Sequence, residues 1–598
     1  MELHLIDIII IALYLVIMII AGSYMSGKAS KDLDAYFLGS KRIPWYYLSV
    51  SNAGGMFDIS GTMWLVYIMF VYGMKSVFIP WIWPLFNQIF LMVYLAAWLR
   101  RSNVLTGAEW ITTRFDQETS GGKLAHLVTV IFSVVSIIGF LSYGFVGIGK
   151  FAKIFLPWDL SPHVYGVIIT VATGIYVVKG GMFGVILTDV LQYILMTISS
   201  VIIAVIAMSK VSPEMLNAVT PSGWQNMLFG WHLNLDWSGI MNSVNAKIAA
   251  DGYSLFTIFI MMAVFKGIFV SAAGPVATQS LQRILAAKTP REAALMNGLA
   301  VIVVSIPRYL MVGGLTILAL AFFSPQLKAM GANIDFELIL PFAISNFIPV
   351  GLMGLLLAGM LSAYMSTTSS FLNLGPAYIV NDIYKKYFRP DASNKTYIKM
   401  SYFVSIIVTL ASIVFGLYIE SVDTATLWIV GALWGGSAAA NLLKWYWWRF
   451  NSYGYFWGML AGLLIALIMP VAFPNTNPLF VYPYILAISM LGSLLGALFT
   501  KPEKDELLIK FYTSVRPWGF WKPILEKVKK QNPGFIENKN LGRDSFNIFA
   551  GTIWQLSLMG APLAFVIKNW TLLTVLILIA AVTSFILKKN WYNKLEND

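Results

Sequence analysis

The sequence predicts an all-α polytopic membrane protein. Of its 598 residues, 58% are hydrophobic and only 12% are charged, and the mean hydropathy is +0.73. A soluble domain usually carries about 25% charged residues, so this chain has about half the expected charge. Its apolar residues also form blocks long enough to cross a bilayer, which takes about 20 helical residues. A soluble hydrophobic core does not explain both observations.

About fifteen apolar blocks, separated by polar breaks, are expected to be transmembrane helices. The first block is not a secretory signal, because Glu2 stands in place of the basic n-region and no cleavage motif follows. We therefore expect it to be a retained helix. The fifteen expected spans are residues 5–24, 46–71, 78–100, 122–150, 161–179, 184–209, 255–280, 293–324, 351–385, 397–418, 424–447, 452–473, 480–500, 547–567 and 571–588.

The distribution of basic residues predicts the orientation. If the N-terminus lies outside, most of the 41 Lys and Arg residues fall in inner loops and in the C-terminal tail. This asymmetry predicts an outer N-terminus and a cytoplasmic C-terminus. It also explains the net charge of +13 as a topology signal, so we expect no nucleic-acid partner.

Two of the expected spans are interrupted. Residues 52–58 read NAGGMFD, and residues 272–275 read AAGP. Glycine permits unusual backbone conformations, and proline removes a backbone donor. Each break alone is compatible with a packing kink. The two breaks are offset by five spans, however, so a repeat of that length is inverted across the membrane. Paired broken helices of this kind are typical of transporter midplane sites.

The ninth span carries a stripe of polar residues. Ser362, Ser366, Ser369, Ser370 and Asn373 recur at helical spacing and share one face. Small hydroxyl residues also line helix interfaces, where they permit close approach. Spacing alone therefore leaves two alternatives open, a binding face and a packing face.

Asp189 favours the binding alternative. It lies about one turn inside the sixth span, and an intramembrane acid indicates a functional site by default, although pairing with a basic residue is the simpler alternative. Hydroxyls, a carboxylate and the carbonyls freed near Met56 and Ile59 are the oxygen ligands that hard cations prefer. The chain has no cysteine, and its four histidines are scattered, so an alkali cation fits better than a transition metal.

These motifs resemble those of the sodium:solute symporters. The resemblance runs from about residue 5 to 500 and implies the leucine-transporter fold, with a 5+5 inverted repeat plus one N-terminal and several C-terminal extra helices. It implies a sodium-coupled symporter that imports a small organic solute by alternating access, and not an enzyme. The matching motifs are Asp58-Ile59-Ser60, Thr188 to Gln192, Gln282 to Ala286, and Ser366 to Asn373 followed by Asp382-Ile383-Tyr384.

The resemblance also implies the ligands of Na⁺. The shared sodium site corresponds to the backbone carbonyls of Met56, Ile59 and Ala363 and the hydroxyls of Ser366 and Thr367. Some members hold a second sodium further in, at positions that are here Asp189, Ser366, Ser369 and Ser370. The resemblance is therefore compatible with one or with two sodium ions per transport cycle.

The expected spans and this resemblance together divide the chain into seven parts. They are an N-terminal extra helix with an inner loop (1–43), a first five-helix repeat (44–209), an outer loop (210–254), a second five-helix repeat (255–450), two accessory helices (451–500), a basic cytoplasmic segment (501–546) and two C-terminal helices with a tail (547–598). The basic segment is expected to dock on anionic lipid headgroups, to cap the transporter or to be a solvated linker.

Three charged residues are candidate solute ligands. Lys266 and Arg308 fall near the middle of the seventh and eighth spans, and Asp58 lies beside the first break. A guanidinium binds carboxylates with two hydrogen bonds, so Arg308 or Lys266 is expected to bind an anion. The alternative is that both bases only neutralise Asp58 and Asp189. The expected solute is a sugar, nucleoside, amino acid or carboxylate, although a galactose-type pocket is disfavoured.

Other functions compete with sodium symport. A proton-coupled symporter of the same fold, using Asp189, is the nearest alternative. A channel would repeat polar rings along a pore, and a membrane enzyme would need a catalytic cluster, and the chain shows neither pattern. Residues 444–451 resemble a bacterial subgroup of the family, so we expect a bacterial inner membrane.

Overall fold

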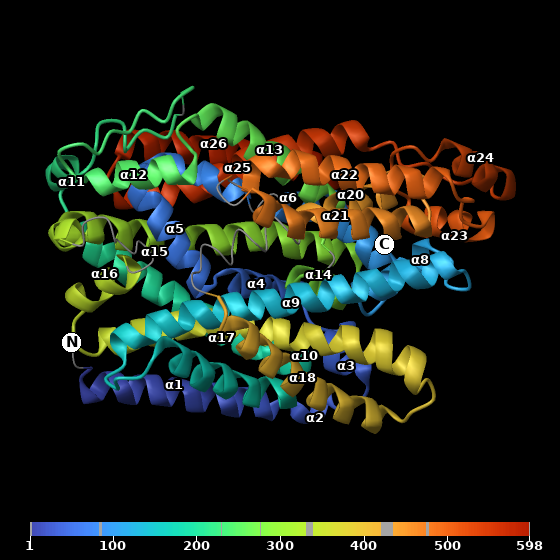
Figure 1. Cartoon of the computed structure of the whole chain (residues 1–598), viewed down its shortest axis with the longest axis horizontal. Coiled ribbons are helices and arrows are strands. Elements are labelled where there is room, and N and C mark those ends of the chain that lie inside the picture. The colour runs from blue at the N-terminus through green and yellow to red at the C-terminus, as the bar shows by residue number, and fades with distance from the viewer. Residues whose placement is uncertain are drawn as a thin grey trace.

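The computed structural model describes residues 3–82, 87–228, 230–275, 277–329, 339–419, 434–473, 476 and 478–596. The named elements in these residues are all helices, and the long ones run side by side along the longest axis of the molecule (Figure 1).

The first half of the chain forms α1 (Leu5–Tyr24), α2 (Ser26–Ala29), α3 (Leu33–Leu38), η1 (Gly39–Lys41), α4 (Trp45–Met56), α5 (Ile59–Tyr72), η2 (Gly73–Ile82), α6 (Asn87–Phe90), η3 (Leu91–Leu95), α7 (Ala96–Arg101), α8 (Gly107–Arg114), α9 (Ser120–Phe155), α10 (Pro162–Lys210), α11 (Pro213–Val219) and α12 (Asn242–Asp251). The second half forms α13 (Phe256–Ala273), α14 (Gln279–Ala286), α15 (Pro290–Ala329), α16 (Ile339–Phe347), α17 (Leu352–Ile379), η6 (Val380–Phe388), α18 (Asn394–Gly416), α20 (Gly435–Tyr446), α21 (Ser452–Ala472), α22 (Pro478–Leu498), α23 (Asp505–Val515), α24 (Lys522–Gln531), α25 (Leu541–Val566), α26 (Trp570–Asn590) and η8 (Tyr592–Lys594).

Twelve helices in the described residues are long and apolar enough to cross a membrane, and each corresponds to one of the fifteen expected spans. The other three expected spans do not correspond to a long apolar helix in the described residues. Residues 161–179 become the first part of α10, where Gly181 at φ +51° separates a short apolar helix from the next span. The expected spans 78–100 and 424–447 each include residues outside those described.

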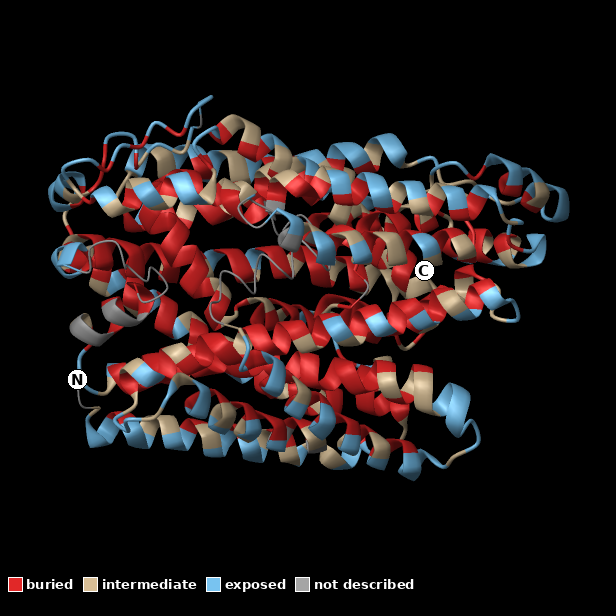
Figure 2. Ribbon diagram, viewed as in Figure 1, coloured by how far each residue is buried: buried red, intermediate tan, exposed pale blue. Residues whose placement is uncertain are grey.

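The outermost helices have the surface expected of a membrane protein. α1 and α26 lie at opposite margins of the bundle (Figure 1). Their large apolar side chains are exposed, as at Leu13, Ile20, Leu578 and Phe585. By contrast, α5 and α17 are buried almost throughout, in the interior that Figure 2 shows in red. The chain is therefore a multi-pass membrane protein whose core surrounds α5 and α17.

Both predicted helix breaks are confirmed. α4 ends at Met56 and α5 begins at Ile59, and the carboxylate of Asp58 caps α5 by accepting a hydrogen bond from the amide of Gly61 at 2.7 Å. α13 ends at Ala273 and is followed by Gly274 at φ +77°, a conformation that favours glycine. α14 begins only at Gln279.

The basic segment 501–546 packs against one end of the bundle. Glu503 accepts hydrogen bonds from the amides of Asp116 at 2.9 Å and Ser452 at 2.8 Å. The indole of Trp521 donates to the carbonyl of Trp445 at 2.8 Å. α23 thus lies beside α8, and both α23 and α24 lie at the end opposite to the N-terminus and α11 (Figure 1). Of the three alternatives for this segment, the packing fits a cap on the bundle.

Candidate functional site

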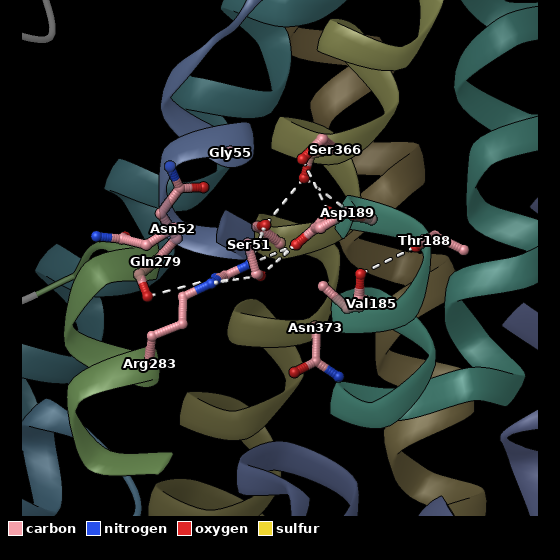
Figure 3. Close-up of polar contacts among 12 residues, drawn as sticks. Ser51, Asn52, Gly55, Val185, Thr188, Asp189, Gln279, Arg283, Ser366 and Asn373 are labelled. Carbon is pink, nitrogen blue, oxygen red and sulfur yellow. Dashed lines mark hydrogen bonds and ion pairs between the residues drawn. The ribbon is translucent and has the colours of Figure 1, made fainter. Parts of the chain in front are cut away.

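A buried ion pair lies where α4, α10, α14 and α17 meet. Asp189 of α10 accepts hydrogen bonds from the hydroxyls of Ser51 at 2.5 Å and Ser366 at 2.7 Å. It also pairs with Arg283 of α14, whose Nη2 lies 3.0 Å from Oδ2, and both side chains are 0% exposed (Figure 3). A charge buried to this degree is stable only when it is paired and hydrogen-bonded.

Arg283 joins this pair to α17. Its Nη2 donates to the hydroxyl of Ser370 at 2.6 Å and to that of Ser51 at 3.0 Å. The hydroxyls of Ser369 and Ser370 in turn each donate to the carbonyl of Ser366 at 2.9 Å. The residues predicted for the second sodium therefore lie together, and a guanidinium already satisfies part of their oxygen set.

The hydroxyl pair predicted for the shared sodium site faces the break between α4 and α5. Thr367 Oγ1 donates to the carbonyl of Gly55 at 2.9 Å and to that of Ala363 at 3.2 Å. A Cβ added at Gly54 would lie 3.2 Å from the hydroxyl oxygen of Ser366, so this glycine permits the close approach of α17. Ile59 and Thr367 line the same small cavity.

The chemistry of this place suits Na⁺. Carbonyl and hydroxyl oxygens are the ligands of hard cations, and each such oxygen has more than one lone pair. The hydroxyl of Ser366 donates its proton to Asp189 and keeps its lone pairs for a cation. The carbonyl of Met56 accepts a hydrogen bond from Nη1 of Arg308 at 2.8 Å and retains a second acceptor site.

A cavity of about 180 Å³ adjoins this place and contains a second ion pair. Arg308 of α15 lies 3.0 Å from Asp58, and Tyr143 donates to the same carboxylate at 2.9 Å. The side chains of Arg308 and Asp58 are 12% and 18% exposed, respectively. Nε of Arg308 is buried and has no hydrogen-bond partner among the described residues. Arg308 itself lines the cavity, and so do Trp64 and Gln279.

Lys266 does not join Asp58 and Arg308. It lies on α13, buried, with its ammonium 5.4 Å from the ring centroid of Tyr482 on α22. It is not among the residues that line the cavity. One alternative was that Lys266 and Arg308 only neutralise the two acids. Arg308 does pair with Asp58. The partner of Asp189, however, is Arg283 and not Lys266.

Sequence reasoning missed two residues of this region. Arg283 stood in a quoted motif, and the need of buried Asp189 for a base was the signal that pointed to such a partner. Gln555 of α25 also lines the cavity. Nothing in its own stretch of sequence marked it, since α25 lies outside the expected repeats.

Comparison with known proteins agrees with this geometry. Residues 36–462 match the model of "Sodium:solute symporter family". The sodium/glucose cotransporter 4 of Danio rerio is 25% identical over 502 residues, which cover 77% of this chain and 71% of that protein. The sodium/myo-inositol cotransporter of Bos taurus is 24% identical over 608 residues, covering 90% and 79%.

A solved structure confirms the fold. The substrate-bound outward-open state of a Na⁺-coupled sialic acid symporter superimposes with a TM-score of 0.64 at 20% identity. The match covers 84% of this chain and 99% of that one. The predicted leucine-transporter architecture is therefore confirmed, and the family match extends over well more than half of the residues. The chain belongs to the sodium:solute symporter family and is a sodium-coupled transporter of a small solute, not an enzyme.

Proposed function

We propose that Na⁺ binds where the break between α4 and α5 faces Ser366 and Thr367, and that this binding couples the sodium gradient to solute uptake. The contact of Thr367 with the carbonyl of Gly55 carries the proposal, because it places a hydroxyl from α17 beside the C-terminal end of α4, directly before the break. The other proposed ligands are the carbonyls of Met56, Ile59 and Ala363. An unwound backbone at membrane depth needs such a partner.

The position of this site between two helices explains coupling. A cation held jointly by α4 and α17 stabilises the state in which the two helices are close. It shifts the equilibrium only because its affinity differs between the two states. We propose that residues 44–209 and 255–450 form the two inverted repeats that move relative to each other.

The solute is proposed to bind in the cavity beside Asp58 and Arg308. Nε of Arg308 has no hydrogen-bond partner within the described part of the chain, and a guanidinium matches a carboxylate with two hydrogen bonds. A solute that bears a carboxylate would compete with Asp58 for Arg308. Lys266 is not assigned a role in binding, because it lies away from the cavity.

A neutral hydroxylated solute is the second candidate. The relatives named above include sodium/glucose and sodium/myo-inositol cotransporters. Trp64, Gln279 and the Asp58 carboxylate supply the aromatic and polar groups that a sugar or polyol needs. Competition distinguishes the candidates: small carboxylates should inhibit uptake in the first case and lose this effect in Arg308→Ala, whereas only polyols and sugars should inhibit in the second.

A second sodium on Asp189, Ser369 and Ser370 is a separate proposal. Na⁺ and the Arg283 guanidinium would compete for the same oxygens, so this ion would enter only as Arg283 moves away. A Hill coefficient for sodium clearly above one in wild-type uptake supports the second ion, and a value near one contradicts it. Proton coupling through Asp189 is not favoured, because the family and the relatives above are sodium-coupled.

The first experiment is a thermal-shift screen of the purified protein in NaCl and in KCl. It uses glucose, myo-inositol, uridine, alanine and lactate as representatives of the solute classes. We expect one class to stabilise the protein, and only in sodium. Equal stabilisation in both salts would contradict sodium coupling. We also propose a bacterial inner membrane as the location, with the N-terminus outside and the C-terminus cytoplasmic, following the distribution of basic residues.

A further inference from the structure

The C-terminal helix α25 lies outside residues 36–462, which match the family. It nevertheless packs directly on the core. A Cβ added at Gly551 would lie 2.7 Å from Ile89 of α6, and one added at Gly313 of α15 would lie 3.2 Å from Leu563. These two close approaches hold the middle of α25 against α6 and α15, two helices that border the solute cavity.

Gln555 and Met559 lie one turn apart, so they share a face of α25. Both line the cavity that contains Asp58 and Arg308. Gln555 is 3% exposed and Met559 is 2% exposed. Another side of the helix is open to the surroundings, since Phe549 is exposed. α25 therefore presents the amide of Gln555 and the thioether of Met559 to the cavity.

An amide carries both a donor and an acceptor, so it can bind a hydroxyl or a carboxylate oxygen. A site built to hydrogen-bond a particular group rejects solutes that lack it. These properties suit a residue that selects among polar solutes.

We propose that α25 forms one wall of the solute site and that Gln555 is a specificity-determining residue, with Met559 limiting the size of the solute. This inference rests on the proposed function, since it assigns the solute to the same cavity. It adds a contribution from a part of the chain that the family match does not include.

The absence of cysteine from the sequence permits a direct test. Single variants Gln555→Cys, Val304→Cys and Ala564→Cys are purified and treated with the thiol reagent MTSET. Val304 lines the same cavity from α15, whereas Ala564 is fully buried on α25. We expect Gln555→Cys and Val304→Cys to react, at rates that differ between sodium and potassium, and Ala564→Cys to remain unmodified.

Labelling of Val304→Cys without labelling of Gln555→Cys would overturn this inference and leave the proposed cavity intact. Labelling of neither would overturn the inference together with the cavity. Sodium-specific stabilisation of the wild type, measured separately, tests the proposed function itself. The two failures are thereby distinguishable.

Selectivity gives a second readout. Gln555→Leu and Gln555→Glu are compared with wild type for stabilisation by myo-inositol, glucose and lactate in sodium. We expect Gln555→Leu to weaken binding of the preferred compound about two- to tenfold, the value of one hydrogen bond. Gln555→Glu should weaken lactate more than the neutral compounds. An unchanged order and potency in both variants would overturn the assignment.

Discussion

Two aspartate–arginine pairs lie near each other in this transporter and differ in their surroundings. Asp189 and Arg283 are 0% exposed and are enclosed by serine hydroxyls, whereas Asp58 and Arg308 are partly exposed at a cavity. The same ion-pair chemistry therefore serves different purposes. A dry, fully hydrogen-bonded pair holds helices together, while a pair at a cavity can exchange its partner for a solute.

The largest effect is expected from breaking the dry pair. Asp189→Ala leaves the Arg283 guanidinium buried without its counter-ion, which should cost about 3–5 kcal/mol. Thermal unfolding in detergent, with uptake into proteoliposomes, measures the loss of both stability and transport. The double variant Asp189→Asn with Arg283→Gln removes both charges and should regain part of the stability. Equal losses in the single and double variants would show that the pair is not the cause.

Breaking the Asp58–Arg308 pair at the cavity should cost less stability than breaking the Asp189–Arg283 pair, but it should weaken solute binding more. Asp58→Asn should cost about 1–2 kcal/mol, because water in the cavity solvates Arg308. Arg308→Ala should abolish solute stabilisation in the thermal-shift assay while sodium still binds. If Asp58→Asn destabilised the protein as much as Asp189→Ala, the contrast between the two pairs would be wrong.

This contrast could be predicted from the sequence only in part. Gly54, Gly55, Gly274 and Pro275 act locally, so both helix breaks were predictable. The pairing of Asp189 was not, because it depends on how α14 packs against α10, far along the chain. From the sequence alone, Lys266 or an arginine could equally well neutralise Asp189. Only the fold decides which base reaches the acid.

The C-terminal part of the site shows the same limit. Their apolar blocks predicted α25 and α26 as helices, and this was confirmed. They did not predict that Gln555 faces the cavity, because an amphipathic pattern does not reveal which helix lies opposite. By contrast, the family resemblance paired the hydroxyls of Ser366 and Thr367, and they do lie against the end of α4 at the break.

The smallest effect is expected at a pair outside the membrane. Lys504 lies 2.8 Å from Asp116, and its hydrogen bond lowers the pKa of Asp116, while the same contact raises the pKa of Lys504 to about 12. The stabilisation is therefore present above the ordinary pKa of aspartate, near ~4, and is lost as the pH falls through the depressed value. Lys504→Ala should lower the Tm slightly at pH 7.

The difference between Lys504→Ala and wild type should shrink as the pH falls below about 4 and should be constant between about pH 6 and 8. Lys527→Ala, on the same basic segment 501–546, is the matched control; Lys527 pairs with Asp505. A difference that grows on acidification would contradict the assignment.

The central claim is that Na⁺ binds between the α4–α5 break and the hydroxyls of α17, and equilibrium binding of ²²Na⁺ to purified protein tests it most directly. Thr367→Ala should weaken sodium binding at least tenfold, while Thr367→Ser, which keeps the hydroxyl, should bind as wild type does. Ser369→Ala should reduce only the number of bound ions if the second ion exists. Unchanged sodium affinity in Thr367→Ala and Ser366→Ala would contradict the account.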